Sequence, residues 1–322
     1  MLDAALAEQL GGPALLVLDR LDRVDPGDLD ALRRVPFITA ARAPLDPVRA
    51  DAVDLVVADD AALDRARAGA SRAPRAATAA ALLLRSPDRD WWAGLVREST
   101  TYSMLQGGTE FLAWRSTRGE PTPATDPSPR VRVADHGPVT EITLTRAGRH
   151  NALDVRLRDA LHAALGEAFT GPGLVVLLGD GPSFCSGGDL DEFGMFPDPA
   201  AAHLVRLSRS PAALLAAHAE RVVVGLHGAC LGAGVELPAF AARVVAADDA
   251  RLGLPELGLG LVPGAGGTVS LPRRVGRHRT LELLLLDGTI SAAAALGWGL
   301  VDEVVPRAHL RARCLEIAES GQ

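Results

Sequence analysis

Apolar positions in the second half of the chain follow two periods, which predict alternating strands and helices. Uninterrupted apolar runs at residues 174–178 and 222–224 are typical of strands buried on both faces of a parallel sheet. One face of an amphipathic helix is marked by leucines spaced four residues apart: Leu153, Leu157, Leu161 and Leu165. Asn151 can cap that helix, because its side chain can accept a hydrogen bond from a free N–H group.

Shorter patterns complete this part of the chain. Residues 131–133 and 140–144 predict two paired strands, joined by a turn at His136-Gly-Pro. Residues 200–219 predict a helical stretch that breaks at Pro211, where the proline ring removes a backbone hydrogen bond. The end of the chain predicts a helix from Leu281 to Gly288 and another over 290–296. A strand over 301–305 follows.

The first 70 residues show the same alternation on a smaller scale. Buried strands are predicted at residues 14–18, 36–40 and 54–58, with helical pieces near 2–10 and 26–32. Both parts of the chain are therefore α/β.

An internal comparison links these two parts. Residues 54–63 align with residues 243–252 at six of ten identical positions, and residues 12–19 resemble residues 171–178. Two explanations of this similarity are open: a duplication within the chain, or a chance likeness between strands that are rich in alanine and valine. We interpret the N-terminal part as a degenerate, inert duplicate, because it has neither of the glycine turns described below.

A helical region and a connector separate the two parts. Residues 76–118 carry three of the four tryptophans and the single tyrosine. Residues 119–130 hold four prolines and predict an extended, mobile linker. The expected division is 1–118 for the N-terminal domain and its helical module, 119–130 for the linker, and 131–322 for the core.

Composition narrows the functional classes. The 322 residues are 48% hydrophobic and carry a formal charge of −7, which disfavours nucleic-acid binding. No apolar stretch is long enough for a membrane helix, and the N-terminus does not resemble a signal peptide. Three scattered cysteines favour a cytoplasmic protein over a disulfide framework. All 33 basic residues are arginine, which excludes Schiff-base chemistry and a Walker-type phosphate loop.

Two glycine-rich turns hold the candidate chemistry. Residues 227–237 read His-Gly-Ala-Cys-Leu-Gly-Ala-Gly-Val-Glu-Leu, and residues 179–190 form a second strand, glycine turn and expected helix start. Such turns can each direct one N–H group at the same oxygen atom. Glu236 follows one turn and Glu256 opens another glycine-rich run, so two carboxylates can move protons beside that oxygen. Taken alone, Glu236 is also compatible with a carboxylate that merely stabilises a helix N-terminus.

Five motifs in order resemble the enoyl-CoA hydratase/isomerase (crotonase) family. They are Asn-Ala-Leu-Asp at 151–154, Phe-Cys-Ser-Gly-Gly-Asp-Leu at 184–190, the run at 227–237, Leu-Pro-Glu-Leu at 254–257 with Val-Pro-Gly-Ala-Gly-Gly-Thr at 262–268, and Gly-Trp-Gly-Leu-Val-Asp-Glu at 297–303. The resemblance spans residues 131–306. It implies a spiral core of ββα repeats and a homo-oligomer, either a trimer or a hexamer.

The resemblance also implies roles for single residues. The N–H groups of Gly188 and Ala233 would form an oxyanion hole for a thioester carbonyl, with Glu236 and Glu256 as the catalytic pair. Substrate contacts are expected from residues around these turns: Ser186, Gly187, Asp189, Leu190, Gly232, Gly264 and, toward the coenzyme, Arg146. Neither a metal nor a redox cofactor is implied, since a coenzyme A thioester is the substrate.

The same comparison raises further points. Asp189 and Glu192 are expected first as helix N-terminal carboxylates and only second as acids. The arginines between 273 and 279 are expected on the surface, with coenzyme phosphate contact as the alternative. Pro238 departs from the family pattern and can tilt Glu236.

These inferences predict a lyase of fatty acid metabolism that adds or removes water on a 2-enoyl thioester. Double-bond isomerisation or decarboxylation with one glutamate is the alternative inside the family, and a non-catalytic acyl-thioester-binding or scaffolding subunit is the alternative outside it. The acyl length, and whether coenzyme A or a carrier protein bears the thioester, stay open. Family members close the core with C-terminal helices, for which this chain has little room after Pro306. Residues 76–118 are therefore predicted to supply them, and ordinary aromatic packing between the two domains is the alternative for this region.

Overall fold

The structure is a computed structural model that describes residues 15–85, 90–120, 125–196, 198–286 and 288–320. The helical piece expected near residues 2–10 lies outside this range. No helix of the described residues is both long and apolar enough to cross a membrane.

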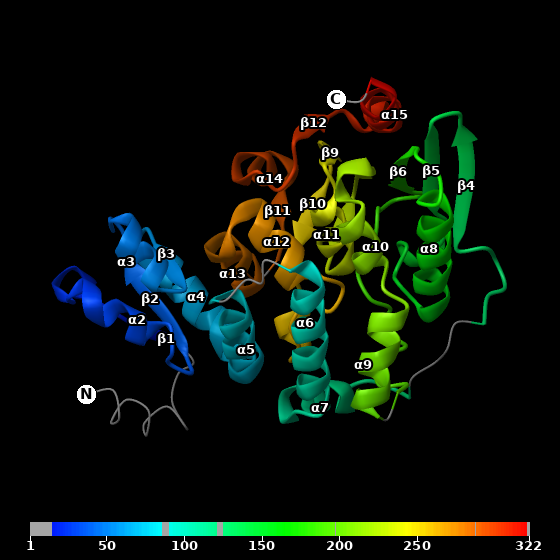
Figure 1. The fold of residues 1–322 in the computed structure, drawn as a ribbon. Helices are drawn as coiled ribbons and strands as arrows, with labels where there is room; N and C mark the ends of the chain where they lie inside the picture. The colour runs from blue at the N-terminus through cyan, green and yellow to red at the C-terminus, as the bar shows by residue number, and fades with distance from the viewer. Residues whose placement is uncertain (1–14, 86–89, 121–124, 197, 287, 321–322) are drawn as a thin grey trace.

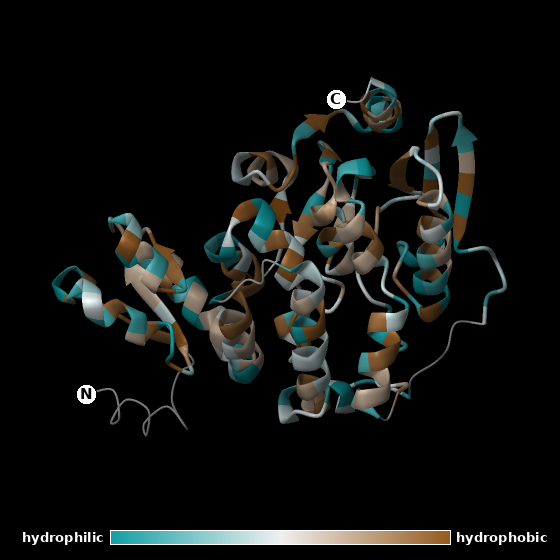
Figure 2. Cartoon of the chain, in the orientation of Figure 1, coloured by the Kyte–Doolittle hydropathy of each residue, from teal (hydrophilic) through white to brown (hydrophobic). Residues whose placement is uncertain are grey.

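A six-stranded sheet forms the centre of the core, in the order β12-β9-β7-β6-β5-β4. Its strands are β4 (Val131–His136), β5 (Val139–Leu144), β6 (Leu174–Gly179), β7 (Val222–Leu226), β9 (Arg243–Ala247) and β12 (Glu303–Val305). All neighbours are parallel except the β4–β5 hairpin, which turns where His136-Gly-Pro predicts. No residue of the edge strand β4 is fully buried, and polar residues stand among its apolar ones (Figure 2), as expected of a strand at the edge of the sheet.

Both faces of this sheet are covered, which explains the uninterrupted apolar runs. Val175 and Leu177 of β6 point into the main core, whereas Val176 and Leu178 point to the opposite face. On that opposite face lies α15 (Leu310–Ser320), through residues such as Ile317. The chain thus carries an α-helix, α15, after Pro306.

A second, smaller sheet stands beside the first. It comprises β8 (Ala229–Leu231), β10 (Arg251–Gly253) and β11 (Ile290–Ser291), in the order β11-β10-β8. The chain passes from β7 of the large sheet to β8 of the small one through Gly228, whose φ of 55° suits glycine. The pairs β7–β8 and β9–β10 therefore each contribute their first strand to the large sheet and their second strand to the small one.

The helices of the core occupy the positions that the patterns predict, with some differences. They are α8 (Val155–Ala168), α9 (Pro199–Ser208), α10 (Pro211–Ala217), α11 (Ala233–Glu236), α12 (Gly267–Val275), α13 (Arg277–Leu285) and α14 (Ala292–Trp298). The expected break at Pro211 separates α9 from α10. The cap of α8 is Asp154, whose side chain accepts from Leu157 N. Asn151 instead adopts a left-handed backbone and donates to the carbonyls of Asp180 and Ser183.

The N-terminal part forms its own three-stranded parallel sheet. Strands β1 (Leu15–Val17), β2 (Ile38–Arg42) and β3 (Leu55–Val57) pair in that order, where the apolar runs predict them. Two short helices accompany them, α2 (Leu29–Leu32) and α3 (Pro47–Ala52). A buried ion pair between Arg85 and Asp54, 2.6 Å long, ties the sheet to the helices that follow.

Four helices then join this sheet to the core: α4 (Asp60–Arg72), α5 (Pro74–Arg85), α6 (Trp91–Gln106) and α7 (Thr109–Ser116). In Figure 1, α4 and α5 lie against α13, and α6 lies beside α9. The described end of the connector is fastened rather than free, because Arg130 pairs with both Asp126 and Asp154.

The contact between α4 and α13 generates a stability prediction. A Cβ atom added at Gly69 would overlap the carbonyl oxygen of Leu285. We expect Gly69→Ala to lower the free energy of unfolding by about 1–3 kcal/mol, because one of the two helices must shift. Urea unfolding followed by circular dichroism measures the change.

The matched control is Gly166→Ala in α8, where no atom lies within 4 Å of the added Cβ. This variant should gain about 0.5–1 kcal/mol, because alanine favours a helix. Equal stabilities for the two variants would contradict the tight packing of α4 on α13.

Candidate active site

Two glycine turns lie against each other at the ends of β6 and β8. Cys185 N donates to Ala229 O over 3.3 Å, and Leu231 N donates to Cys185 O over 3.0 Å. A Cβ at Gly234 would overlap the Cys185 carbonyl oxygen, and one at Gly187 would lie 3.0 Å from Leu231 O. The glycines therefore permit a backbone approach that any side chain would block.

The N–H groups of Gly188 and Ala233 have no acceptor among the residues that the structure describes. Ala233 is the first residue of α11, where helix geometry leaves N–H groups unpaired. The backbone on either side of Gly188 is pinned to Leu153, which donates to Gly187 O and accepts from Asp189 N. Both N–H groups are thus fixed in place and free to bind an oxygen atom.

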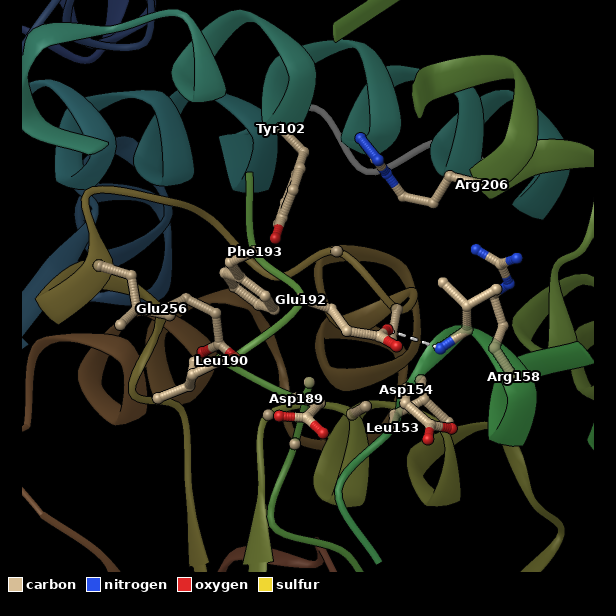
Figure 3. A pocket seen from close by; sticks show the side chains of 18 of the residues that line it. Tyr102, Leu153, Asp154, Arg158, Asp189, Leu190, Glu192, Phe193, Arg206 and Glu256 are labelled. Atoms are coloured by element: carbon tan, nitrogen blue, oxygen red, sulfur yellow. Dashed lines mark hydrogen bonds between the residues drawn. The ribbon is translucent and has the colours of Figure 1, made fainter. Parts of the chain in front are cut away.

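Both turns border a cavity of about 400 Å³ (Figure 3). All but one of the residues singled out in the sequence line this cavity: Ser186, Gly187, Gly188, Asp189, Leu190, Gly232, Ala233, Glu236, Glu256 and Gly264. Side chains of the helices α6 and α9 form another wall of the cavity. The fold brings together side chains that lie up to about half the chain apart in sequence.

Glu236 is the last residue of α11 and is buried. Its Oε2 accepts hydrogen bonds from Ala265 N at 2.7 Å and from Gly267 N at 2.9 Å. Burial, followed by the charges of Glu256 and Glu98, raises the pKa of Glu236 well above its ordinary value. Pro238 begins a separate 3-10 turn, Pro238–Phe240, after α11 has ended. It therefore lies outside the helix that carries Glu236.

Glu256 lines the same cavity and stands at the start of the 3-10 turn Glu256–Leu259. Its Oε1 packs on Gly232, where a Cβ would lie 2.5 Å away. Its Oε2 is buried and has no hydrogen-bond partner among the described residues. Burial raises the pKa of Glu256 to about 8.

A third buried carboxylate comes from outside the core. Glu98 of α6 accepts from Gly266 N and from both the N–H and the hydroxyl of Thr268, each at 2.7 Å. Burial raises its pKa to about 7. Sequence reasoning missed Glu98, because a glutamate within a helical stretch is ordinary. The one available signal is that Glu98 stands four residues before Tyr102, the single tyrosine, so both side chains lie on the same face of a helix.

Tyr102 is the second unpredicted residue. Its ring lies so close to Gly264 that a Cβ there would be 2.6 Å away, and its hydroxyl points into the cavity (Figure 3). Arg206 of α9 stacks over this ring, with its Cζ atom 4.4 Å from the ring centroid. Burial lowers the pKa of Arg206 and raises that of Tyr102. Helices α6 and α9 thus give the cavity a polar wall.

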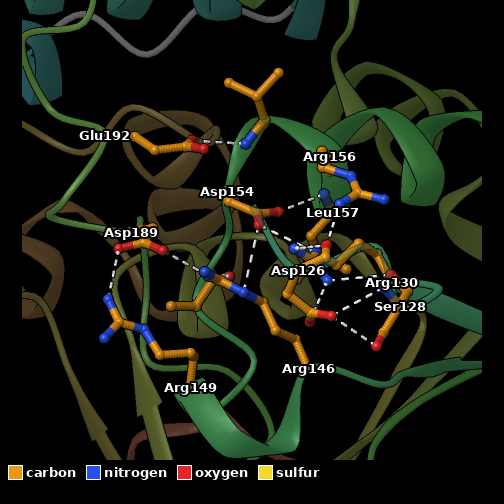
Figure 4. A network of polar contacts seen from close by, with 12 residues as sticks. Asp126, Ser128, Arg130, Arg146, Arg149, Asp154, Arg156, Leu157, Asp189 and Glu192 are labelled. Carbon is orange, nitrogen blue, oxygen red and sulfur yellow. Dashed lines mark hydrogen bonds and ion pairs between the residues drawn. The ribbon is translucent and has the colours of Figure 1, made fainter. Parts of the chain in front are cut away.

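Arg146 is the predicted contact residue that the structure places elsewhere. It is buried behind the cavity wall, 2.6 Å from Asp189 and 3.3 Å from Asp154 (Figure 4). Burial opposes ionisation of Asp189, yet the bond from Arg146 lowers the pKa of that carboxyl group. Arg146 therefore supports the Gly188 turn instead of facing a coenzyme.

Two other expectations are also decided here. Glu192 accepts from Val155 N, the first residue of α8, over 2.7 Å, as a helix N-terminal carboxylate does. No helix follows Asp189, since residues 189–195 form turns. In the arginine cluster, Arg274 binds the carbonyls of Ala241 and Leu300, away from the cavity.

Comparisons with known proteins agree with this geometry. A sequence model of the enoyl-CoA hydratase/isomerase family matches residues 135–320. The structure is similar to the enoyl-CoA hydratase of Bacillus anthracis, with 34% identity, 60% of this chain and 76% of that chain covered, and a TM-score of 0.55. The structure is also similar to the enoyl-CoA hydratase of Thermoplasma volcanium GSS1, with 31% identity and a TM-score of 0.55. This match covers 60% of this chain and 78% of that chain.

A third similar structure carries a ligand. This protein of Thermobifida fusca YX was solved in complex with CoA and shares 32% identity, with 60% of this chain and 78% of that chain covered and a TM-score of 0.55. Residues 1–134, which include α6, lie outside the family match.

The buried carboxyl groups predict how stability depends on pH. Glu98 and Glu256 have pKa values of about 7 and about 8 in the folded protein, against an ordinary value of 4.5. Above pH 4.5 the unfolded chain releases these protons while the folded protein keeps them. The free energy of unfolding should therefore fall as the pH rises from about 5 to about 8.

Urea unfolding across this range measures the effect. Glu256→Gln should make the decline shallower, because glutamine does not titrate. Glu316→Gln, at an exposed side chain of α15, is the control and should keep the wild-type slope. An equally steep decline in Glu256→Gln would show that Glu256 does not carry a proton in the folded protein.

Proposed function

The chain belongs to the enoyl-CoA hydratase/isomerase family, and we propose that it is a hydratase-type lyase that adds water to, or removes it from, a 2-enoyl thioester. One observation carries this proposal. Two buried carboxyl groups, Glu236 and Glu256, share a cavity with two unpaired N–H groups on adjacent turns.

The two N–H groups bind the oxygen on which charge develops. Attack of water at the β-carbon moves an electron pair onto the thioester oxygen and produces an enolate. Donors fixed at Gly188 and Ala233 stabilise this enolate more than the neutral carbonyl, which lowers the barrier. One such donor contributes about 3–4 kcal/mol in other enzymes.

The surroundings of the two carboxyl groups suggest their division of labour. Two N–H groups favour the charged form of Glu236, so Glu236 takes a proton from water as the oxygen bonds to the β-carbon. The buried Oε2 of Glu256 has no hydrogen-bond partner among the described residues, so nothing there favours its charged form over the protonated one. It gives its proton to the α-carbon as the enolate collapses. The two groups exchange protonation states, and dehydration reverses both transfers.

The substrate side of the proposal rests on the cavity and on one relative. The Thermobifida fusca YX protein was solved with CoA, which supports a coenzyme A thioester as substrate, with no further cofactor. Tyr102 and Arg206 supply polar groups to the wall formed by α6 and α9. This supports the proposal that residues 76–118 help to close the site. The trimeric or hexameric assembly and the origin of the N-terminal sheet by duplication stay predictions of the sequence.

Hydration of crotonyl-CoA tests the proposal. The reaction removes the double bond that is conjugated with the thioester carbonyl, so the ultraviolet absorbance of the enoyl thioester falls as water is added. Glu236→Gln and Glu256→Gln should each lower kcat by about 10²- to 10⁴-fold, because each removes one proton transfer. Glu141→Gln, which removes a buried carboxylate of β5 outside the cavity, is the control and should retain activity.

Other outcomes separate the alternatives. Loss of activity in only one glutamate variant, together with turnover of a 3-enoyl thioester, would indicate double-bond isomerisation. Binding of acyl thioesters without any turnover would indicate a non-catalytic subunit.

A further inference from the structure

Four consecutive backbone N–H groups at the start of α12 are divided between two carboxylates. Ala265 and Gly267 donate to Glu236 at 2.7 and 2.9 Å. Gly266 and Thr268 donate to Glu98, both at 2.7 Å. The bonds alternate residue by residue, so the segment 265–268 is held from both sides at once.

The two carboxylates come from different parts of the chain. Glu236 belongs to the glycine turn of the core, whereas Glu98 belongs to α6, outside the family match. The helices α6 and α12 are in close contact there, because a Cβ at Gly94 would lie 2.8 Å from the side chain of Val269. Glu98 also binds the Thr268 hydroxyl, so it fixes both the backbone and the side chain at the start of α12.

We propose that Glu98 is a positioning residue for Glu236. It holds Gly266 and Thr268 so that the intervening N–H groups of residues 265 and 267 stay aimed at Glu236 Oε2. The other oxygen of Glu236 then keeps a fixed place beside the substrate. This inference rests on the proposed function, since it assigns Glu236 a part in the reaction.

The charge of Glu98 also acts on the reacting pair. Its negative charge raises the pKa of both Glu236 and Glu256. Several charged or titratable groups face Glu98 or share its small cleft: Tyr102 on α6, Arg158 on α8, Arg206 and Arg209 near α9, Glu236 on α11 and Glu256. Among them Arg206 opposes the effect of burial on Glu98. Removal of the Glu98 charge should therefore lower the pKa values of the catalytic pair.

The test compares Glu98→Gln with Glu110→Gln. Glu110 of α7 accepts from Arg75 N and Ala76 N at 2.9 and 3.0 Å, so it caps two N–H groups of the same helical module away from segment 265–268. Glu98→Gln should lower kcat by about 10- to 100-fold with little change in KM, because misplaced catalytic groups slow chemistry more than binding. Its pH–rate profile should shift to lower pH. Glu110→Gln should show neither change.

A second pair of variants keeps all carboxylates in place. Thr268→Val removes the hydroxyl that binds Glu98 without changing the side-chain shape, and it should lower kcat by several-fold. Thr268→Ser retains the hydroxyl and should restore the wild-type rate. If Glu98→Gln does not fold, this pair decides the question. Wild-type kcat and pH profiles in both Glu98→Gln and Thr268→Val would overturn the proposal.

Hydrogen exchange separates this proposal from the proposed function. Amide exchange over residues 262–271, measured by mass spectrometry, should accelerate in Glu98→Gln and not in Glu110→Gln. If the wild-type protein turns over no thioester, the proposed function fails, and this measurement still reports on Glu98. Unchanged exchange in Glu98→Gln would show that Glu98 does not hold the segment.

Discussion

The close contact between two glycine turns is the constraint on which the rest of the structure depends. The turn after β6 and the turn after β8 approach so tightly that Gly187 and Gly234 have no room for a side chain. This approach places Gly188 and Ala233, whose N–H groups have no acceptor in the part of the chain that the structure describes, at the border of one cavity. The large sheet makes it possible, because its neighbouring parallel strands β6 and β7 end at the same edge, and the chain passes from β7 directly into β8 of the small sheet. Apolar strands buried on both faces therefore specify the position of the polar groups.

The same arrangement imposes an electrostatic cost. Three carboxyl groups, Glu98, Glu236 and Glu256, are buried close together, and the charge of Glu98 raises the pKa of both Glu236 and Glu256. Loss of water disfavours their charged forms, and four backbone N–H groups of residues 265–268 offset part of that cost. The offset is uneven, because Glu256 accepts none of these four bonds. Inequality between two neighbouring carboxyl groups is what allows one to act as a base while the other acts as an acid.

The sequence predicts the core and much of the site because both follow local patterns. Strand runs, the Pro211 break and the glycine turns are each encoded within about ten residues, so they can be read before the fold is known. Predictions failed where a distant partner decides. Arg146 precedes Asn151 and suggested a coenzyme contact, but Asp154 and Asp189 hold it behind the wall. Asn151 suggested a helix cap, but it binds two carbonyls of the neighbouring turn. Glu98 and Tyr102 could not be assigned, since only tertiary packing brings α6 to the cavity.

The position of α6 makes the helical module part of the cavity wall, since Tyr102 lines the cavity. Without α6, Gly266 and Thr268 would lose the acceptor for their N–H groups, and the cavity would lose the wall formed by Tyr102. The module is in turn tied to the core by Gly94, whose lack of a side chain allows contact with α12, and the preceding helix α4 is tied to α13 in the same way by Gly69. Segments inside and outside the family match therefore depend on each other. Segment 265–268 is held by Glu236 from the core and by Glu98 from the other side. The helix that carries Glu98 precedes the core in the same chain.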